Sequence, residues 1–186
     1  MLRLSREVHC DLAGIKVEAF KTLQRYGWLP TLPPYLRSAK PFAPIETLTL
    51  ALYNAFSEQH RVHRLYAANI CSSADILLTR WEEIRKTTAN WQRQLEAEIL
   101  FGRATYPGLP TDRGGAKPVL GTLEEIAAEH LGAMAIITVS VTRVSESVTS
   151  RAERRDIDFN QFWTEPASSK RSPAGKPSRG KKGGAR

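Results

Sequence analysis

The chain has 186 residues, a formal net charge of +8 and 41% hydrophobic residues, enough for the core of one domain or two small ones. No apolar run approaches the ~20 residues of a membrane-spanning helix, and the first residues lack the apolar segment and cleavage site of a signal peptide. Cys10 and Cys71 are too few for a disulfide framework, so we expect a reduced, cytoplasmic protein that does not interact with membranes.

The positive charge is concentrated at the C-terminal end of the chain. Residues 166–186 contain seven of the 27 basic residues and no acidic residue, which leaves 20 basic against 19 acidic residues elsewhere. Almost nothing in this Lys/Arg/Gly/Pro/Ser-rich segment can be buried, so we expect a disordered basic tail. Its charges would either add salt-sensitive, non-specific affinity for nucleic acid or serve only for solubility.

Two short helices joined by a tight turn are predicted at the start of the chain. The hydroxyl of Ser5 can cap the first free amides of a helix in which Val8 and Leu12 share an apolar face. Gly14 suits the tight turn that follows. This pattern is typical of a helix-turn-helix, whose second helix can enter a groove of DNA.

The second helix is predicted over residues 15–25, and it has an apolar and a polar face. Phe20 and Leu23 share the face that we expect in the core. Gly27 ends the helix as a C-terminal capping residue. Four side chains are expected on the solvent face: Glu18, Lys21, Thr22 and Arg25.

Five prolines between residues 28 and 44 exclude a long helix there and favour a loop or short edge strands, in which Arg37 and Lys40 lie. Pro44 then lies in the first turn of a further helix. The apolar stripe of that helix consists of Ile45, Leu48, Leu52 and Phe56. Another helix is predicted over roughly residues 58–70, with an apolar side made of Val62, Leu65, Tyr66 and Ile70.

A longer helix is predicted to begin at residues 72–75, where Ser-Ser-Ala-Asp is typical of a helix start. Side chains along it alternate at spacings of four and three residues, the pattern of a coiled-coil seam. They are Leu77, Trp81, Ile84, Thr88, Trp91 and Leu95. Because fewer than three heptads are covered, two interpretations stay open. The helix packs within its own domain, or Leu77, Trp81, Ile84, Trp91 and Leu95 join two copies as a homodimer.

Strands and helices are both predicted after residue 97. The predicted strands cover residues 99–105, 118–120 and 133–141, and the last is rich in β-branched residues. The Gly and Pro content of residues 106–117 predicts a loop. Helices are predicted over 122–129, where Thr122 and Glu125 have the capping-box spacing, and over 143–155 and 157–163. This order favours a small mixed or parallel sheet.

Roughly residues 3–60 resemble the MerR-type winged helix-turn-helix regulators. In that family a short helix, a tight turn and a recognition helix lead to a glycine and a Leu-Pro segment. A basic wing follows, then an aromatic residue and a helix with an acidic residue in its first turn. The matching residues are Ala13-Gly14, the helix 17–25, Gly27-Trp28-Leu29-Pro30, Arg37, Lys40, Phe42 and Glu46. The wing of this chain is proline-rich, and the cysteine cluster of metal-sensing members is missing from the sequence.

With this resemblance, the expected fold is mainly α with a small α/β part. The predicted divisions are a winged helix-turn-helix over residues 1–70, a connector or dimerisation helix over 71–97, a small α/β module over 98–165 and the disordered basic tail over 166–186. The module after residue 97 resembles no effector-binding domain. The resemblance implies DNA binding by a dimer, and it implies neither an inducer nor a metal.

The function that follows is a sequence-specific transcriptional regulator of double-stranded DNA. Residues 17–25 would lie in the major groove, and a basic wing over residues 31–42 would lie on the backbone. Lys21 and Arg25 would contact either a guanine edge or a phosphate, and Glu18 would either accept a hydrogen bond from cytosine or repel a phosphate. The predicted DNA-binding residues are Lys16, Glu18, Lys21, Thr22, Arg25, Arg37 and Lys40. Any one of them taken alone has an ordinary alternative, a solvated surface residue.

The sequence predicts no enzyme, and neither a catalytic residue nor a cofactor is expected. His60 and His63 have the i, i+3 spacing of two metal ligands, but no third ligand lies at a diagnostic spacing, so we expect solvent-facing histidines and no metal. Cys10 is expected to be a small buried residue rather than a nucleophile. His130 is expected at a helix C-terminus, where a positive charge is favourable.

Two other functions stay open. A protein-interaction or assembly adaptor, such as a phage-encoded one, would use the winged helix as a protein-binding surface, and charge reversal at Lys21 and Arg25 would leave its partner binding intact. An RNA- or ribosome-associated factor would act through the tail, so truncation after Glu165 would abolish nucleic-acid binding. For a regulator, the same truncation would only weaken it.

Overall fold

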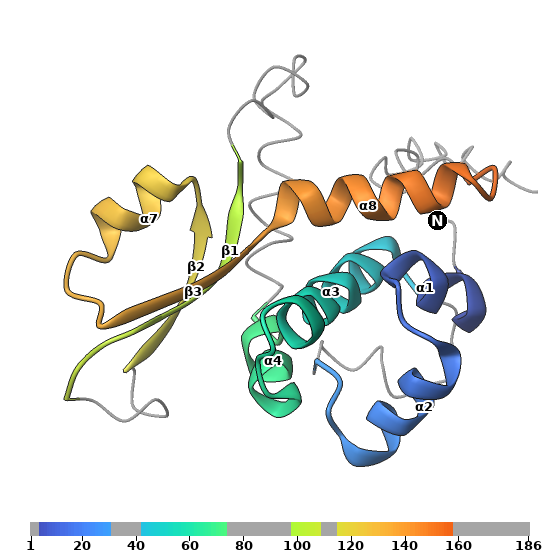
Figure 1. Cartoon of the computed structure of the whole chain (residues 1–186), viewed down its shortest axis with the longest axis horizontal. Coiled ribbons are helices and arrows are strands. Elements are labelled where there is room, and N and C mark those ends of the chain that lie inside the picture. Colours follow the sequence, from blue (N-terminus) through green and yellow to red (C-terminus); the bar gives the residue numbers. More distant parts are fainter. Residues whose placement is uncertain (1–3, 31–41, 74–97, 109–114, 158–186) are drawn as a thin grey trace, which may run out of the picture.

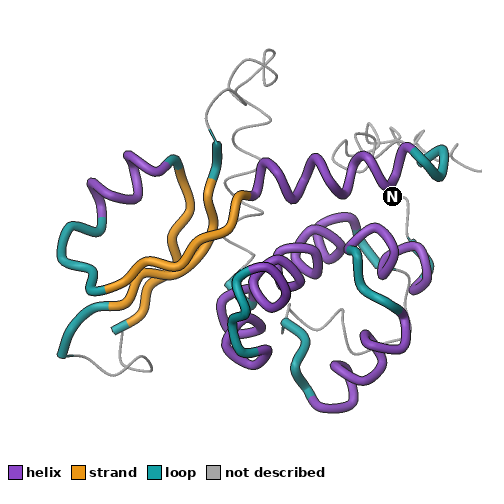
Figure 2. The backbone as a smooth tube through the Cα atoms, in the orientation of Figure 1, coloured by secondary structure: helices purple, strands orange, loops and turns teal. Residues whose placement is uncertain are grey.

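The protein combines helices from both ends of the sequence with one small sheet (Figures 1 and 2). The computed structural model describes residues 4–30, 42–73, 98–108 and 115–157. Its elements are α1 (Arg6–Ala13), α2 (Val17–Tyr26), α3 (Pro44–Asn54), the π-helical segment η2 (Ala55–Gln59), α4 (Arg64–Cys71), β1 (Leu100–Thr105), β2 (Ala116–Gly121), α7 (Leu123–Glu129), β3 (Ala135–Ser140) and α8 (Val141–Glu153). The fold is therefore mixed α/β, with six α-helices and one sheet in the part of the chain that is described.

Helices α1 and α2 form the predicted pair with a tight turn between them. Ser5 Oγ accepts a hydrogen bond from the amide of Val8 at 3.3 Å, which confirms the predicted cap. Gly14 has φ 74° and Gly27 has φ 66°, so both glycines occupy the left-handed conformation that ends a helix. Helix α2 begins two residues later than predicted, because the amide of Ile15 donates to the carbonyl of Cys10 and thereby belongs to the turn.

Helix α3 lies in the middle of the helical part of the fold, against α1, α4 and α8 (Figure 1). Nine of its eleven residues are buried, so the predicted single apolar stripe is too narrow a description. Glu46, Thr47 and Thr49 are buried although they are polar, whereas Ile45 from the predicted stripe is only half-buried. Pro44 lies in the first turn as predicted.

The prediction of one helix over residues 58–70 is wrong. The end of α3 widens into η2, and residues 60–63 are not helical before α4 begins. The amide of Val62 donates to the carbonyl of Phe56, and Arg61 has φ 51°, so the chain reverses here and folds α4 back onto α3. Leu65 is 47% exposed rather than buried. Ser72, the first residue of the predicted helix start over 72–75, is the C-cap of α4, and the helix predicted after it lies outside the described residues.

The sheet has the order β2-β1-β3 and is antiparallel throughout, so the predicted mixed or parallel sheet is wrong. Strands β2 and β3, which α7 connects, do run in the same direction, as expected for a strand-helix-strand unit. The central strand β1 lies between them, and Phe101 pairs with Leu120 on one side and with Val139 on the other. The capping box of α7 is confirmed, since Thr122 Oγ1 accepts from the amide of Glu125 and Glu125 Oε2 accepts from that of Thr122.

Helix α8 leaves the sheet directly after β3 and packs along α1 and α3 (Figure 1). It begins at Val141, two residues before the predicted start, because Ser140 caps it through the amide of Arg143. Val148 and Ala152 belong to the same hydrophobic core as the buried residues of α1, α2 and α3. The first helices and the last one therefore share a core, although some 140 residues separate α1 from the end of α8 along the chain.

Several predicted segments lie outside the described residues. They are most of the wing, most of the connector helix 71–97 with all five dimerisation residues, the helix 157–163 after its first residue and the tail 166–186. Among the helices that are described, none is long and apolar enough to cross a membrane.

Candidate nucleic-acid interface

Helix α2 buries one face and exposes the other, as predicted. Phe20 is 1% exposed and Leu23 is 5% exposed, and both belong to the main core. The predicted polar side chains of Glu18, Lys21, Thr22 and Arg25 are all on the exposed side. The two apolar anchors therefore fix the helix on the protein and leave a polar face to solvent.

Interactions within α2 leave its cations available. Lys21 Nζ lies 2.9 Å from Glu18 Oε1, but both side chains are at least half exposed, so this ion pair contributes little and can be exchanged for another partner. The hydroxyl of Thr22 donates to the carbonyl of Glu18, one turn earlier. Arg25 is exposed in the last turn and forms no ion pair with any residue that the structure describes.

Lys16 marks the beginning of this face. It is the N-cap residue of α2, it is exposed, and its side chain does not cap the helix. The first amides of a helix have no partner within it, and the helix dipole gives this end a partial positive charge. Lys16 adds a full positive charge to that end, although it lies outside the helix proper.

A buried aromatic cluster holds α1, α2 and the start of α3 together. The ring of His9 stacks on Phe42 with 4.0 Å between centroids, and its edge meets Phe20 at 5.6 Å. Nδ1 of His9 is 2.8 Å from Thr47 Oγ1. Burial lowers the pKa of His9 to about 3, so the ring is neutral at physiological pH. Phe42 in turn pairs with Leu4 through two backbone hydrogen bonds, which brings the chain back beside the start of α1.

Sequence reasoning missed the role of His9. Leu12 is buried and Val8 packs against the core as the sequence predicts, but His9, Cys10 and Ala13 are buried as well. The spacing of His9, Leu12 and Ala13 by three and four residues was the available signal. Residue type alone does not indicate a histidine in the core, because its buried neutral form depends on partners that are distant in sequence.

The other candidate residues show no reactive arrangement. Burial raises the pKa of Cys10 to about 11 and raises that of Cys71 as well, so both thiols are protonated at neutral pH. His60 and His63 are exposed at the two ends of the turn before α4. No group of three potential metal ligands occurs among the residues that the structure describes. His130 is at the C-terminal end of α7, where its Nδ1 is hydrogen-bonded to the hydroxyl of Tyr106.

Two predicted sets cannot be placed on this surface. The wing residues Arg37 and Lys40 lie outside the described ranges, and so do Leu77, Trp81, Ile84, Trp91 and Leu95.

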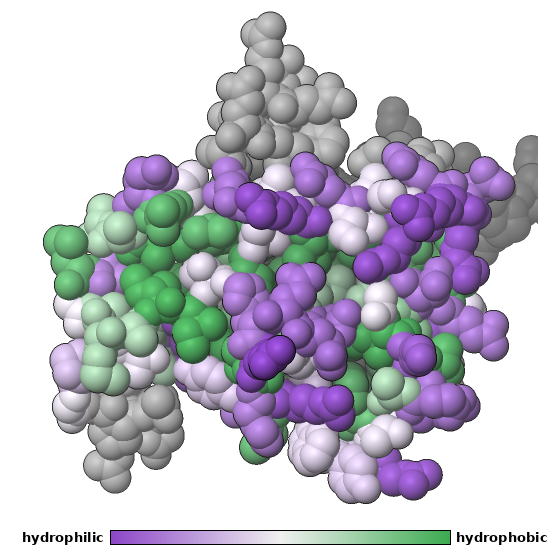
Figure 3. Space-filling model, viewed as in Figure 1, coloured by the Kyte–Doolittle hydropathy of each residue, from purple (hydrophilic) through white to green (hydrophobic). Residues whose placement is uncertain are grey.

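The exposed large apolar side chains of the sheet region are Leu123, Leu131, Met134 and Ile136. In the view of Figure 3, apolar surface gathers over that region, whereas the surface over the helices is mainly hydrophilic.

Comparison of the sequence with models of known protein families and with curated proteins finds no match.

Proposed function

We propose that the protein is a sequence-specific DNA-binding regulator that reads the major groove with α2. The observation that carries this proposal is the exposed, basic outer face of α2, which buried anchors and a left-handed glycine turn hold against α1. An α-helix with its side chains is about 10–12 Å in diameter, which matches a major groove about 12 Å wide, and α2 has ten residues. The helix is therefore of a suitable size for a groove reader.

Among the elements that the structure describes, none covers the polar face of α2, whose side chains are exposed. Helix α8 packs on α1 and α3, and Figure 1 shows α2 on the side of α1 that is turned away from α8. In this proposal Lys21 and Arg25 contact base edges or phosphates, Thr22 adds a hydroxyl, and Glu18 selects against unsuitable bases. The positions of Phe42 and of Glu46, in the first turn of α3, fit the order of features that the MerR-type resemblance implies. The wing over residues 31–42 would contact the backbone.

The test is selection of bound sequences from a random pool of duplexes, with the full chain at moderate salt. We expect recovery of one motif, and a dimer would give two half-sites about 10 base pairs apart. The motif should be lost in the Lys21→Ala, Arg25→Ala double variant. A matched control is the Lys117→Ala, Arg143→Ala double variant, which removes the same charge from exposed positions on β2 and α8. Equal loss in both variants, or no motif with the wild type, would exclude sequence-specific reading by α2.

A second candidate is a protein-interaction adaptor, and one observation favours it. Tyr26 at the end of α2 is 59% exposed and stacks on Trp28 with 5.0 Å between ring centroids. Exposed aromatic residues are enriched at protein interfaces. For an adaptor, Tyr26→Ala would weaken binding to the protein partner and Lys21→Glu with Arg25→Glu would not. No catalytic activity is part of either proposal.

A further inference from the structure

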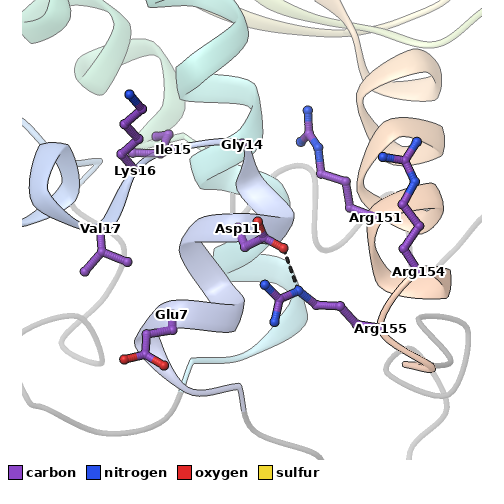
Figure 4. Close-up of a pocket in the computed structure, with 9 residues that line it drawn as sticks. All are labelled: Glu7, Asp11, Gly14, Ile15, Lys16, Val17, Arg151, Arg154 and Arg155. Atoms are coloured by element: carbon purple, nitrogen blue, oxygen red, sulfur yellow. Dashed lines mark hydrogen bonds and ion pairs between the residues drawn. The ribbon is translucent and has the colours of Figure 1, made fainter.

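A groove separates the α1–α2 turn from the last turns of α8 (Figure 4). Its volume is about 840 Å³. Asp11 and Lys16 lie on the side of α1 and the turn, and Arg151, Arg154 and Arg155 line the side of α8. The groove thus joins side chains that are about 140 residues apart in sequence, and no spacing along the chain could have revealed it.

The groove carries an excess of positive charge. Arg155 Nε is 2.6 Å from Asp11 Oδ2, so these two charges offset one another. Arg151 Nη1 donates to the carbonyl of Leu12 at 2.9 Å, which orients the guanidinium without neutralising it. Within the described residues Lys16, Arg151 and Arg154 form no ion pair. The lining therefore contains three cations without an ion pair and one further carboxylate, Glu7, which is also unpaired among those residues.

The fold positions two of the arginines, Arg151 and Arg155, through contacts with α1 and its turn. Gly14 has no Cβ, and a Cβ there would lie 2.8 Å from Nη1 of Arg151. The guanidinium thus occupies space that the glycine leaves open over the turn. The Arg155–Asp11 pair holds the end of α8 beside α1. Arg154 is the C-cap residue of α8 and lies between Arg151 and Arg155 in the sequence.

We propose that this groove binds phosphates of the DNA backbone, next to the part of the duplex that α2 reads. The inference depends on the proposed function and extends the interface from α2 to α8. Guanidinium groups match the geometry of phosphate oxygens. Lys16 and Val17 line the groove and also begin α2, so the groove adjoins the N-terminal end of the proposed recognition helix.

The lining favours a phosphate backbone over a small organic effector. Pockets for small molecules are lined mainly by hydrophobic and aromatic side chains. Here Ile15 and Val17 are the only large apolar residues among those that line the groove, and none of the lining residues is aromatic. A chain of phosphates needs no apolar enclosure, so a lining of charged side chains with only two aliphatic ones suits it.

The test compares Arg154→Ala and Lys16→Ala with a matched control in the full chain, on the duplex recovered by selection. The control is Arg143→Ala, which removes an exposed arginine from the same helix at a position paired with Glu98, outside the groove. Affinity is measured across a salt series. We expect each groove variant to reduce the slope of log K against log salt by about 0.9 and to weaken binding to matched and mismatched duplexes equally. Arg143→Ala should change neither quantity.

The outcomes separate this inference from the proposed function. If the groove variants behave like Arg143→Ala while Lys21→Ala with Arg25→Ala still abolishes the motif, the groove inference is wrong and the proposed function stands. If the wild type binds duplexes without preference and Arg154→Ala weakens that binding, the groove inference stands and sequence-specific reading fails. If the wild type binds no duplex, both fail. A titration with inorganic pyrophosphate is the final arm, and binding that Arg154→Ala abolishes without any change in duplex affinity would assign the groove to a free phosphate ligand instead.

Discussion

The contact between Gly14 and Arg151 can be measured by replacing each of two helix-ending glycines with alanine. Gly14 and Gly27 have similar left-handed conformations, with φ 74° and 66°. Placing an L-residue with a Cβ in this conformation costs about 1–2 kcal/mol at either position. At Gly27 an added Cβ would meet no atom within 4 Å, so the backbone cost is the whole effect there.

At Gly14 the added Cβ would also displace the guanidinium of Arg151, whose Nη1 would be only 2.8 Å away. The displacement breaks the hydrogen bond from Arg151 to the carbonyl of Leu12, which is partly buried. Hydrogen bonds of charged groups contribute about 1.5–3 kcal/mol, and we take about 1 kcal/mol here because solvent can replace part of the bond. Gly14→Ala should therefore cost about 2–3 kcal/mol, about 1 kcal/mol more than Gly27→Ala.

Urea unfolding followed by far-UV circular dichroism gives the free energy of unfolding of each variant. In an Arg151→Ala background the excess cost at Gly14 should disappear, because the guanidinium is no longer there to be displaced. Equal costs of the two glycine substitutions in the wild-type background would refute the reasoning, and with it the claim that Arg151 is positioned by the turn.

Three further results are expected. Burial lowers the pKa of His9 from 6.5 to about 3, so its contribution to stability is complete above pH 6.5 and is lost as the pH falls towards 3. The free energy of unfolding, measured by urea unfolding at each pH, should accordingly drop by about 2 kcal/mol between pH 8 and pH 5. A drop of the same size in the His9→Phe variant would show that the titration of His9 is not its cause. Gly102→Ala should cost about 3 kcal/mol in thermal unfolding, because a Cβ on β1 would lie 1.8 Å from the carbonyl oxygen of Ile137 on β3; an unchanged melting temperature would exclude so close an approach of the two strands. Truncation after Glu165 should weaken duplex binding and flatten its salt dependence without changing the selected motif, and complete loss of binding would instead favour a factor that acts through the tail.

The features that the sequence predicted correctly depend on neighbours within a few residues. Ser5 caps α1, Thr122 and Glu125 form a capping box, and Gly14 and Gly27 end their helices in the left-handed conformation. Each involves hydrogen bonds that span three to five residues, so residue type and spacing suffice to predict it. The exposed face of α2 was predicted for a similar reason, since helical periodicity alone separates it from Phe20 and Leu23.

The features that the sequence could not predict depend on distant partners. The predicted direction of the strands was wrong, because the alternation of strands and helices along the chain does not determine that β1 lies between β2 and β3. The break before α4 depends on the contact of Val62 with the carbonyl of Phe56. The groove depends on Asp11 and Arg155, which lie 144 residues apart. Tertiary packing determines such contacts, so residue type and local spacing do not predict them.

The net charge of +8 gives no direct information about where a nucleic acid would bind. Outside the tail the basic and acidic residues nearly balance, so a specific interface must come from the positions of cations and not from their number. The structure brings Lys16, Arg151 and Arg154 to one groove, and it places Lys21 and Arg25 on the adjacent helix. If the tail supplied the binding, removing any of these cations would have the same small effect as removing Arg143. If α2 and the groove supply it, the effect depends on position: substitutions on α2 alter the sequence preference, and substitutions in the groove alter only the affinity and its salt dependence.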